Sequence, residues 1–584
     1  MDTRPWLKWY GDVPSSLRYP SGTLYQAIMA TAARLPEWPA VEFLGHTESY
    51  REFGRRIDRC ADALHAVGLG QGERLAIAMP TSPQGVIAFY AANKLGAVPA
   101  MIHPLAVPTE IASYLNASHA RIALILDAFY AKFAEVRSRT GLQTLILARI
   151  CDDFGPLKRL GYWVTRGRKI PAVPPDPGVR WWSELMAGSH PTAPAAQVGA
   201  DDAAAIIFSG GTTGTPKGIV LSSRNLISEG LQVATWVGMH EGDAILAILP
   251  LFHGAGLGLG INAALLSGCK SIMVPMFSAP IVARLIRRHR PTLMVGVPTL
   301  YDALTRDPLM ARADLSCLRA AFAGADTLPR SVKERFEQLI ADSGGRLKLL
   351  EGYGLTEAVT AIMASPLDHY REGSIGVPFP DMLATICHPD RTDPLPPGAE
   401  GEICVSGPAV MLGYLDDAAA TAGALRTHQD GRVWLHTGDL GRMDEEGFFY
   451  FTCRLKRMIK SSGFNVYPAQ VEGVLCQHSA VTQACVIGVP DEAQVERVKA
   501  FVVLKDPLSA GPDLAARLIA HCHQHLIKWA CPRDVEFRAE LPLTRLGKID
   551  FNALVREELG RRTADPGGKA IPGAGPTGRQ GAAV

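Results

Sequence analysis

Short apolar runs alternate with amphipathic helical patterns along most of the chain. The apolar run 75–79 precedes a helical pattern over 84–93, and the run 293–297 precedes another over 299–304. Strands that alternate with helices are typical of α/β layers rather than of a helix bundle or a β-sandwich. No repeat of fixed period is visible. The pattern therefore predicts an α/β fold class.

One stretch of the pattern is long enough to suggest a membrane span. Residues 244–269 contain no Asp, Glu, Lys or Arg, and about 20 apolar residues can cross a bilayer as a helix. Pro250 and His253 interrupt this stretch, and glycines follow at alternate positions from 254 to 260. We therefore expect a buried strand over 244–249, a glycine-rich loop, and a buried helix near 261–266.

Composition and charge narrow the class of protein. The 584 residues include 59 Lys and Arg against 57 Asp and Glu, so the chain lacks the basic excess of a general nucleic-acid binder. At about 150 residues per domain, the length suggests three or four units. The 11 cysteines include no Cys-x-x-Cys pair, and the first residues contain no apolar leader segment. We expect a reduced, cytoplasmic protein.

Residues 154–171 combine basic and apolar side chains. Lys158, Arg159, Arg166, Arg168 and Lys169 are interleaved with leucines and aromatic residues. Such a segment can lie on an anionic membrane surface, at the inner face of the membrane. In the alternative interpretation its apolar side packs on the domain. The sequence leaves both open.

A strand-like run leads into a loop that is suited to phosphate. The loop reads Ser209-Gly210-Gly211-Thr212-Thr213-Gly214-Thr215-Pro216-Lys217. Glycines expose backbone N–H groups, hydroxyls add donors, and lysine adds a positive charge. It is not a Walker A loop, because Thr215 and Pro216 separate Gly214 from Lys217. On these residues alone, a flexible surface turn is an equal alternative.

The loop resembles the phosphate-binding signature of the adenylate-forming superfamily, which comprises acyl-CoA synthetases, peptide-synthetase adenylation domains and luciferases. Gly210 stands where the signature usually has serine. The resemblance implies that ATP phosphates are bound by Ser209, Gly211, Thr212, Thr213, Gly214 and Lys217.

Further motifs follow in the order of that superfamily. Pro250-Leu251-Phe252-His253 resembles the motif beside the carboxylate pocket, and Gly324-Ala325-Asp326 resembles the turn that lines the adenine site. Tyr353-Gly354-Leu355-Thr356-Glu357 resembles the motif in which tyrosine stacks on adenine and threonine bonds to phosphate. The resemblance makes Glu357 the ligand of Mg²⁺, a cation that prefers oxygen.

The remaining motifs lie in the last third of the chain. His436-Thr437-Gly438-Asp439 resembles the motif whose aspartate binds both ribose hydroxyls, and the position of Arg454 implies a further ribose contact. Lys456 takes the position of a hinge between two domains. Lys548, in Gly547-Lys548-Ile549, takes that of the adenylation lysine. Arg457 replaces an acidic residue common in the superfamily, and Phe551 replaces a basic one.

The resemblance covers roughly residues 20–555 and implies a two-part architecture. We expect a large N-terminal domain of layered α/β subdomains over 1–454, a small mobile α+β C-terminal domain over 455–560, and a disordered tail over 561–584. The tail is rich in Gly, Pro and Ala and lacks periodicity.

The implied activity is a ligation in two steps that uses ATP, Mg²⁺ and CoA. A carboxylate attacks the α-phosphate of ATP to form an acyl-adenylate and pyrophosphate, and the CoA thiol then displaces AMP. The implied catalytic residues are Lys548, Thr356, Glu357 and His253. Rotation about Lys456 would remove Lys548 and bring the CoA-binding residues Ser461, Ser462 and Gly463 into place.

The acid itself is indicated less directly. The small or apolar residues Gly254, Ala255, Gly256 and Leu257 follow His253 and predict an acyl pocket for an apolar tail. The stretch Pro5-Trp6-Leu7-Lys8-Trp9-Tyr10 and the basic segment 154–171 resemble bacterial long-chain fatty-acid–CoA ligases. We therefore expect a medium- to long-chain fatty acid as substrate, and a monomer or homodimer without nucleic acid.

Three alternatives stay open at this stage. A fatty acyl-AMP ligase would load a carrier protein, although such enzymes usually lack the lysine found here at 217. A non-catalytic acyl- or nucleotide-binding protein could share the fold. His521 and His525, four residues apart on an expected helix, could share a zinc ion, but no third ligand is evident.

Overall fold

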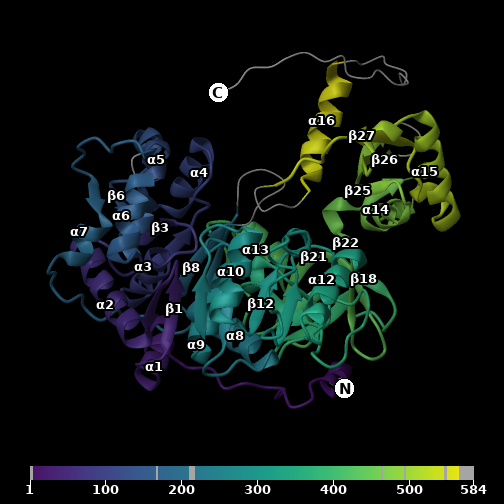
Figure 1. Ribbon diagram of the computed structural model, residues 1–584. Helices are drawn as coiled ribbons and strands as arrows, with labels where there is room; N and C mark the ends of the chain where they lie inside the picture. The colour runs from purple at the N-terminus through teal and green to yellow at the C-terminus, as the bar shows by residue number, and fades with distance from the viewer. Residues whose placement is uncertain are drawn as a thin grey trace. The chain divides into compact units, whose positions relative to one another are not determined.

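The computed structural model describes residues 4–165, 169–208, 217–461, 464–491, 495–544 and 549–564 (Figure 1). The chain divides into two compact units. Unit 1 comprises Met1–Gly398, Cys404–Thr437 and Met443–Tyr450, and unit 2 comprises Ala399–Ile403, Gly438–Arg442 and Phe451–Val584. The polypeptide thus passes between the units several times.

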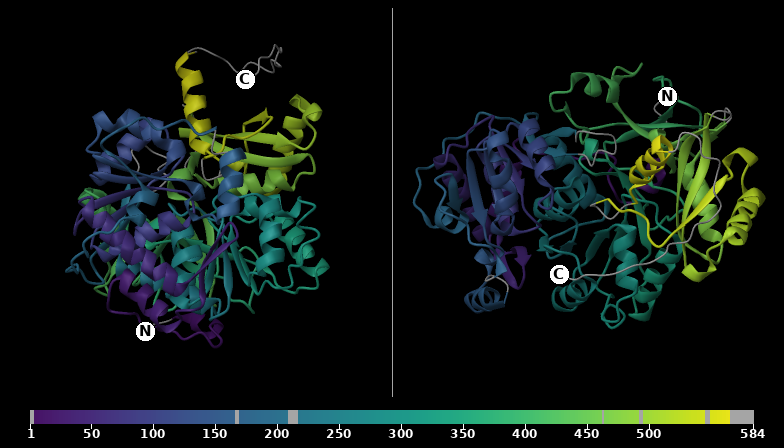
Figure 2. Two further views of the ribbon diagram at one scale, coloured as in Figure 1. Left: turned by 60° about the vertical axis from the view of Figure 1, so that its left-hand side comes forward. Right: turned by 90° about the horizontal axis from the view of Figure 1, so that it is seen from above.

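The first sheet of unit 1 has eight strands. In spatial order they are β19 (Gly413–Tyr414), β9 (Gly218–Ser222), β8 (Ala203–Phe208), β4 (Val98–Met101), β3 (Arg74–Ala78), β5 (Ile122–Leu126), β6 (Thr144–Ala148) and β7 (Val179–Trp181). All neighbours from β8 to β7 are parallel, and β9 is antiparallel to both its neighbours. Helices lie on both faces of this sheet (Figure 2). They include α2 (Tyr50–Ala66), α3 (Pro83–Lys94), α4 (Pro108–Ser118) and α5 (Tyr130–Val136).

The second sheet of unit 1 has nine strands. In order they are β16 (Val377–Pro378), β15 (Ala361–Ala364), β14 (Leu349–Gly354), β13 (Ala320–Ala323), β12 (Leu293–Gly296), β10 (Ala244–Ala247), β11 (Lys270–Met273), β1 (Pro39–Phe43) and β2 (His46–Ser49). Strands β14 to β1 are parallel, and the outer pairs are antiparallel. One face buries a core against α10 (Ala279–His289), α11 (Pro298–Thr305) and α12 (Arg330–Asp342).

The other helices of unit 1 pack around these two sheets. They are α1 (Leu24–Arg34), α6 (Pro156–Thr165), α7 (Trp182–Ala187), α8 (Ser223–Trp236), α9 (Ala263–Ser267) and α13 (Ala418–Ala424). Helices α1 and α8 both contact α9, whose leucines Leu265 and Leu266 are buried.

A third sheet has the order β17 (Leu383–Cys387), β18 (Glu400–Ser406), β21 (Val433–Met443) and β20 (Leu425–Thr427), with β22 (Phe449–Arg454) paired to β21. Its strands β18, β21 and β22 contribute residues to both units.

Unit 2 also contains a five-stranded sheet. Its order is β24 (Phe464–Val466), β23 (Ile459–Ser461), β26 (Val495–Leu504) and β25 (Val481–Asp491), with β27 (Asp534–Arg538) parallel to β26. One face packs on α14 (Pro468–Gln477) and α15 (Pro512–His525), and the other on α16 (Phe551–Ala564). Helix α16 continues four residues into the segment 561–584 that was expected to be a tail. The rest of that segment lies outside the described residues.

The predicted α/β class is confirmed, and several predicted elements are present. Strand β3 and α3 occupy the first predicted strand–helix pair, and β12 and α11 occupy the second. In the uncharged stretch, β10 is followed by a π-helix over Gly256–Asn262 and then by α9. The π-helix replaces the expected loop. No helix in the described ranges has the length and apolarity that crossing a membrane requires.

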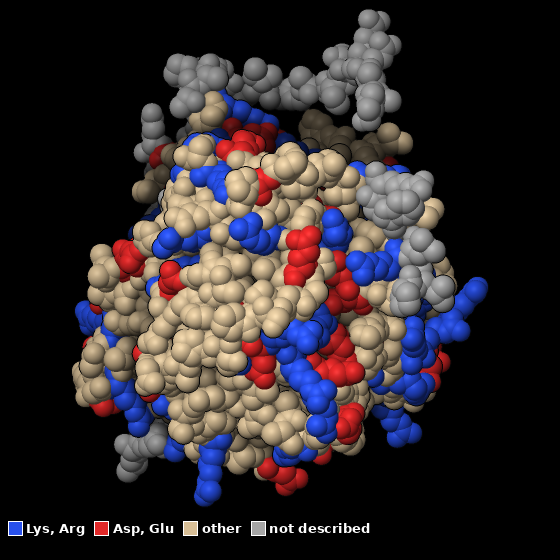
Figure 3. Space-filling view, turned by 90° about the vertical axis from the view of Figure 1, so that its left-hand side faces the viewer, with Lys and Arg blue, Asp and Glu red and all other residues tan. Residues whose placement is uncertain are grey.

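The basic segment around α6 packs at least part of its apolar side on unit 1. Tyr162 lies edge-on to Phe154, with ring centroids 5.6 Å apart, and Phe154 lies 6.4 Å from Phe43. The ammonium group of Lys158 donates to the carbonyl of Leu44. In Figure 3, Lys and Arg are intermingled with Asp and Glu on the face shown. These contacts favour the interpretation in which the apolar side of the segment packs on the domain. A membrane contact of residues 154–171 stays a prediction.

The glycines before and within the π-helix permit very close backbone packing. A Cβ at Gly254 would lie 1.9 Å from the carbonyl oxygen of Val359, and one at Gly256 would lie 2.0 Å from that of Pro250. Val359 itself has φ +65°, a strained conformation for a β-branched residue. Gly254 therefore allows the chain around Val359 to keep this path.

We expect Gly254→Ala to lower the free energy of unfolding by about 2 kcal/mol or more, because overpacking against backbone cannot be relieved by a side-chain rotation. Urea unfolding measures the change. Gly423→Ala is the matched control: it lies in α13 with open space where its Cβ would be, and alanine there should be neutral or stabilising. Equal stability of wild type and Gly254→Ala would contradict the packing argument.

Candidate nucleotide and acyl site

Glu357, the predicted magnesium ligand, lies in a short 3₁₀ turn, Thr356–Ala358, directly after β14. Its Oε1 accepts a hydrogen bond of 2.9 Å from the hydroxyl of Tyr414, and its carbonyl accepts one of 2.8 Å from the amide of Met411. Burial and the Glu357 carboxylate raise the pKa of Tyr414. The carboxylate is thus held in one orientation, and its oxygens are of the type that Mg²⁺ prefers.

Tyr414 also contacts Lys217, the last residue of the predicted phosphate loop. The Lys217 Nζ lies 4.7 Å from the centre of the Tyr414 ring and 3.9 Å from Asp417 Oδ2. One tyrosine therefore brings the predicted phosphate-binding lysine and the predicted metal-binding glutamate to a common place. Sequence reasoning did not identify Tyr414, because a tyrosine in a two-residue strand carries no local signal of this role.

The residues predicted to surround adenine lie at neighbouring strand ends. Tyr353 is in β14 and is largely buried. Gly324 and Ala325 follow β13, the parallel neighbour of β14. A Cβ at Gly324 would lie 3.0 Å from the carbonyl oxygen of Gly352, and Ala325 has φ +70°. The turn therefore runs close beside the strand that carries Tyr353, and its role in binding adenine stays a prediction.

His253 lies in the turn between β10 and the π-helix. Its Nδ1 accepts a hydrogen bond of 3.2 Å from the amide of Ala255, which places the ring proton of the neutral form on Nε2. Its carbonyl accepts hydrogen bonds from the amides of Gly256 and Leu257, each of 3.0 Å. The imidazole is thereby oriented by the first residues of the predicted acyl pocket.

A buried carboxyl group, Glu229 of α8, faces the same glycine run. The side chain is fully buried, and a Cβ at Gly258 would lie 2.6 Å from its Oε2. Its Oε1 accepts a long hydrogen bond of 3.4 Å from the amide of Ala361, and Oε2 has no hydrogen-bond partner in the described part of the chain. Burial raises the pKa of Glu229 to about 8. This contact could not be predicted from the sequence, because residues 229 and 258 are brought together only by the packing of α8 on the π-helix.

The predicted ribose-binding pair belongs to unit 2. Arg454 Nε lies 3.3 Å from Asp439 Oδ1, and the Asp439 side chain is only 4% exposed. The fold therefore brings together two residues that are 15 positions apart. Lys456 lies in a 3₁₀ turn, Leu455–Arg457, between β22 and β23, and its role as a hinge stays a prediction.

Several predicted site residues cannot be placed. Ser209, Gly211, Thr212, Thr213, Gly214, Ser462, Gly463 and Lys548 lie outside the described residues. Ser461, predicted to contact CoA, ends β23 and is 1% exposed.

Two of the departures from the superfamily motifs, Arg457 and Phe551, contact each other in unit 2. The guanidinium carbon of Arg457 lies 4.8 Å from the centre of the Phe551 ring. Arg457 also forms an ion pair with Glu472 of α14 and donates to the carbonyl of Val486. A cation over an aromatic face is stabilising, so the unusual arginine and the unusual phenylalanine form one packing unit.

The histidines of α15 do not gather three ligands. His521 Nε2 lies 3.1 Å from the carbonyl oxygen of Val474, and the rings of His521 and His525 are 4.8 Å apart. Within the described ranges, the groups of three or more converging His, Cys, Asp or Glu side chains include neither residue. The structure therefore lends no support to zinc at His521 and His525.

Comparisons with known proteins agree with the motifs. The AMP-binding enzyme family matches residues 28–415, and the AMP-binding enzyme C-terminal domain matches residues 470–548. The chain is 34% identical to a long-chain-fatty-acid–CoA ligase of Bacillus subtilis (strain 168), over 95% of this chain and 98% of that one. It is also 34% identical to a feruloyl-CoA synthase of Amycolatopsis sp, over 90% and 96%.

Among solved structures, ATP-bound MatB from Rhodopseudomonas palustris is similar with a TM-score of 0.79 and 27% identity, covering 92% of this chain and 99% of that one. The expected large N-terminal part of layered sheets and smaller C-terminal part are confirmed. The chain therefore belongs to the AMP-binding enzyme family and is an AMP-forming acid–thiol ligase.

Proposed function

We propose that this protein joins a medium- to long-chain fatty acid to CoA in two steps. The observation that carries the proposal is the meeting of Glu357 and Lys217 on Tyr414, which suits the metal-bound phosphates of ATP. Relatives named long-chain-fatty-acid–CoA ligase support the class of acid.

In the first step, a carboxylate oxygen of the acid bonds to the α-phosphorus of ATP, and the bond to the bridging oxygen breaks to release pyrophosphate. In the second, the CoA sulfur bonds to the acyl carbon and AMP leaves with the bonding electrons. Neither step requires a protein nucleophile, so catalysis rests on positioning and on stabilising charge at phosphorus.

Each site residue has a role in this scheme. Lys217, with Thr212 and Thr213, binds the departing pyrophosphate, and Thr356 binds phosphate. Mg²⁺, when bound, neutralises polyphosphate charge, and Glu357 is its ligand. Tyr353, Gly324 and Ala325 surround adenine, Asp439 and Arg454 bind ribose, and His253 borders the carboxylate. Lys548 serves the first step, and Ser461, Ser462 and Gly463 line the path of CoA in the second.

A second class of acid is supported by the names of other relatives. One relative is named feruloyl-CoA synthase and another 4-coumarate–CoA ligase. An aromatic acid is therefore the alternative.

A panel of carboxylic acids distinguishes the two proposed classes of substrate. Rates of AMP release with saturating ATP and CoA should rise from hexanoate to palmitate, because each methylene buried contributes about 0.8 kcal/mol, or about fourfold in kcat/KM, until the pocket is filled. Higher kcat/KM for 4-coumarate or ferulate would reject the fatty-acid assignment. AMP release that needs a carrier protein instead of CoA would identify an acyl-AMP ligase.

Lys548→Ala should abolish ATP–pyrophosphate exchange and spare thioester formation from supplied acyl-AMP, because the lysine acts only in the first step.

Lys456→Pro should retain ATP–pyrophosphate exchange and lose thioester formation, because a rigid hinge blocks the rotation that the second step requires. Loss of both half-reactions in either variant would argue against the assigned role.

Glu229→Gln should change the dependence of stability on pH. The raised pKa means that folded protein holds a proton which the unfolded chain has lost, so the free energy of unfolding falls as the pH rises from about 5 to about 8. The fall amounts to at most about 5 kcal/mol, at 1.36 kcal/mol per pKa unit. Urea unfolding at both ends of this range should show a smaller decrease for Glu229→Gln than for wild type. Parallel decreases would mean that Glu229 titrates normally.

A further inference from the structure

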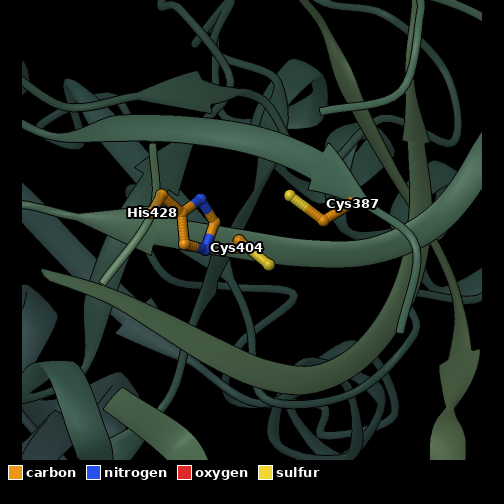
Figure 4. Close-up of side chains that lie close together, drawn as sticks. All are labelled: Cys387, Cys404 and His428. Carbon is orange, nitrogen blue, oxygen red and sulfur yellow. The ribbon is translucent and has the colours of Figure 1, made fainter. Parts of the chain in front are cut away.

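The strands of the third sheet bring two buried cysteines and a histidine together. Cys387 ends β17, Cys404 lies in the adjacent strand β18, and His428 directly follows β20. Their ligand atoms, the two Sγ atoms and a ring nitrogen, all lie within 4.8 Å of one another. Figure 4 shows the three side chains close together, with the sulfur of Cys387 pointing toward the imidazole ring of His428.

The three side chains are held in place by their surroundings. Both cysteines are fully buried, and His428 is 8% exposed. The His428 ring stacks on Trp434, with ring centroids 5.1 Å apart and an interplanar angle of 15°. Cys387, Cys404 and Trp434 share one small apolar cluster. A preorganised site of this kind loses little entropy when it binds a ligand.

A second histidine, His436, fixes the orientation of His428. The Nε2 atoms of His428 and His436 are 3.0 Å apart, so one ring donates an N–H to the other, and His436 Nδ1 lies 3.5 Å from Cys404 Sγ. A hydrogen bond of this type on a ligating histidine sets its tautomer and ring position in metal sites. The ring of His436 also converges with Cys404 and Glu402, so that it borders the three-residue cluster on the side of Cys404.

We propose that Cys387, Cys404 and His428 bind a zinc ion, with water as the fourth ligand. Thiolate and imidazole donors in a small buried space select zinc over Mg²⁺ or Ca²⁺, which need oxygen ligands. Binding displaces the thiol protons to solvent. The ion would tie β17 to β18 and to the segment after β20, and would take no part in the ligation.

Metal content and a spectrum test the proposal on the full-length protein. After incubation with zinc under a reducing agent and removal of unbound metal, wild type should retain about one zinc per chain. Cobalt(II) in place of zinc should produce a thiolate-to-metal charge-transfer band. Cys387→Ser and His428→Gln should each lose the band and most of the metal.

Cys60→Ser is the matched control, because it removes a buried thiol of α2 outside the cluster, and it should bind metal as wild type does. Each variant is checked for cooperative thermal unfolding. A chelator should lower the Tm of zinc-loaded wild type and leave that of Cys387→Ser unchanged, because only the former gains stability from the ion. His521→Asn tests binding at α15 and should leave the band intact.

Two outcomes would overturn the proposal. In one, wild type retains no zinc and gives no band with cobalt(II). In the other, Cys387→Ser retains as much metal as wild type, which would place the ion elsewhere. Either result would leave these side chains as a hydrogen-bonded apolar cluster.

Discussion

The close approach of two backbone segments is the constraint on which the geometry of unit 1 depends. Gly254 lies against the carbonyl of Val359, and a Cβ at Gly354 would lie 1.4 Å from the carbonyl oxygen of Thr360. Because Gly254 and Gly354 have no side chains, the turn after β14 can fold back between this strand and the start of the π-helix. Glu357 occupies that turn, so its position follows from packing that involves no charge. The strained φ of Val359 persists because its neighbours leave the chain no other path.

The sequence predicted those parts of the fold that depend on local pattern. The strand–helix pairs at β3–α3 and β12–α11 could be read from periodicity, because their apolar positions match the repeat of each element. The π-helix could not be read in this way. Glycine normally indicates a loop, and only the surrounding protein decides that glycines 256, 258 and 260 form buried helical turns.

The same distinction between local pattern and long-range packing applies to the residues of the candidate site. The motifs predict roles for Glu357, Lys217, Tyr353 and Asp439, because the resemblance to the superfamily assigns these positions to metal, phosphate, adenine and ribose. Tyr414 and Glu229 could not be predicted, since their contacts join residues that are far apart in the chain. Two exceptions to the motifs, Arg457 and Phe551, were visible separately in the sequence, but their contact was not.

The way the chain is divided between its units has a consequence for dissecting it. Unit 2 includes Ala399–Ile403 and Gly438–Arg442 in addition to everything from Phe451 onward. A fragment that starts near the predicted hinge would lack these two strand segments, together with Asp439, the partner of Arg454. A single cut in the polypeptide therefore cannot separate the two units. A C-terminal fragment would lack residues of unit 2 that precede the cut.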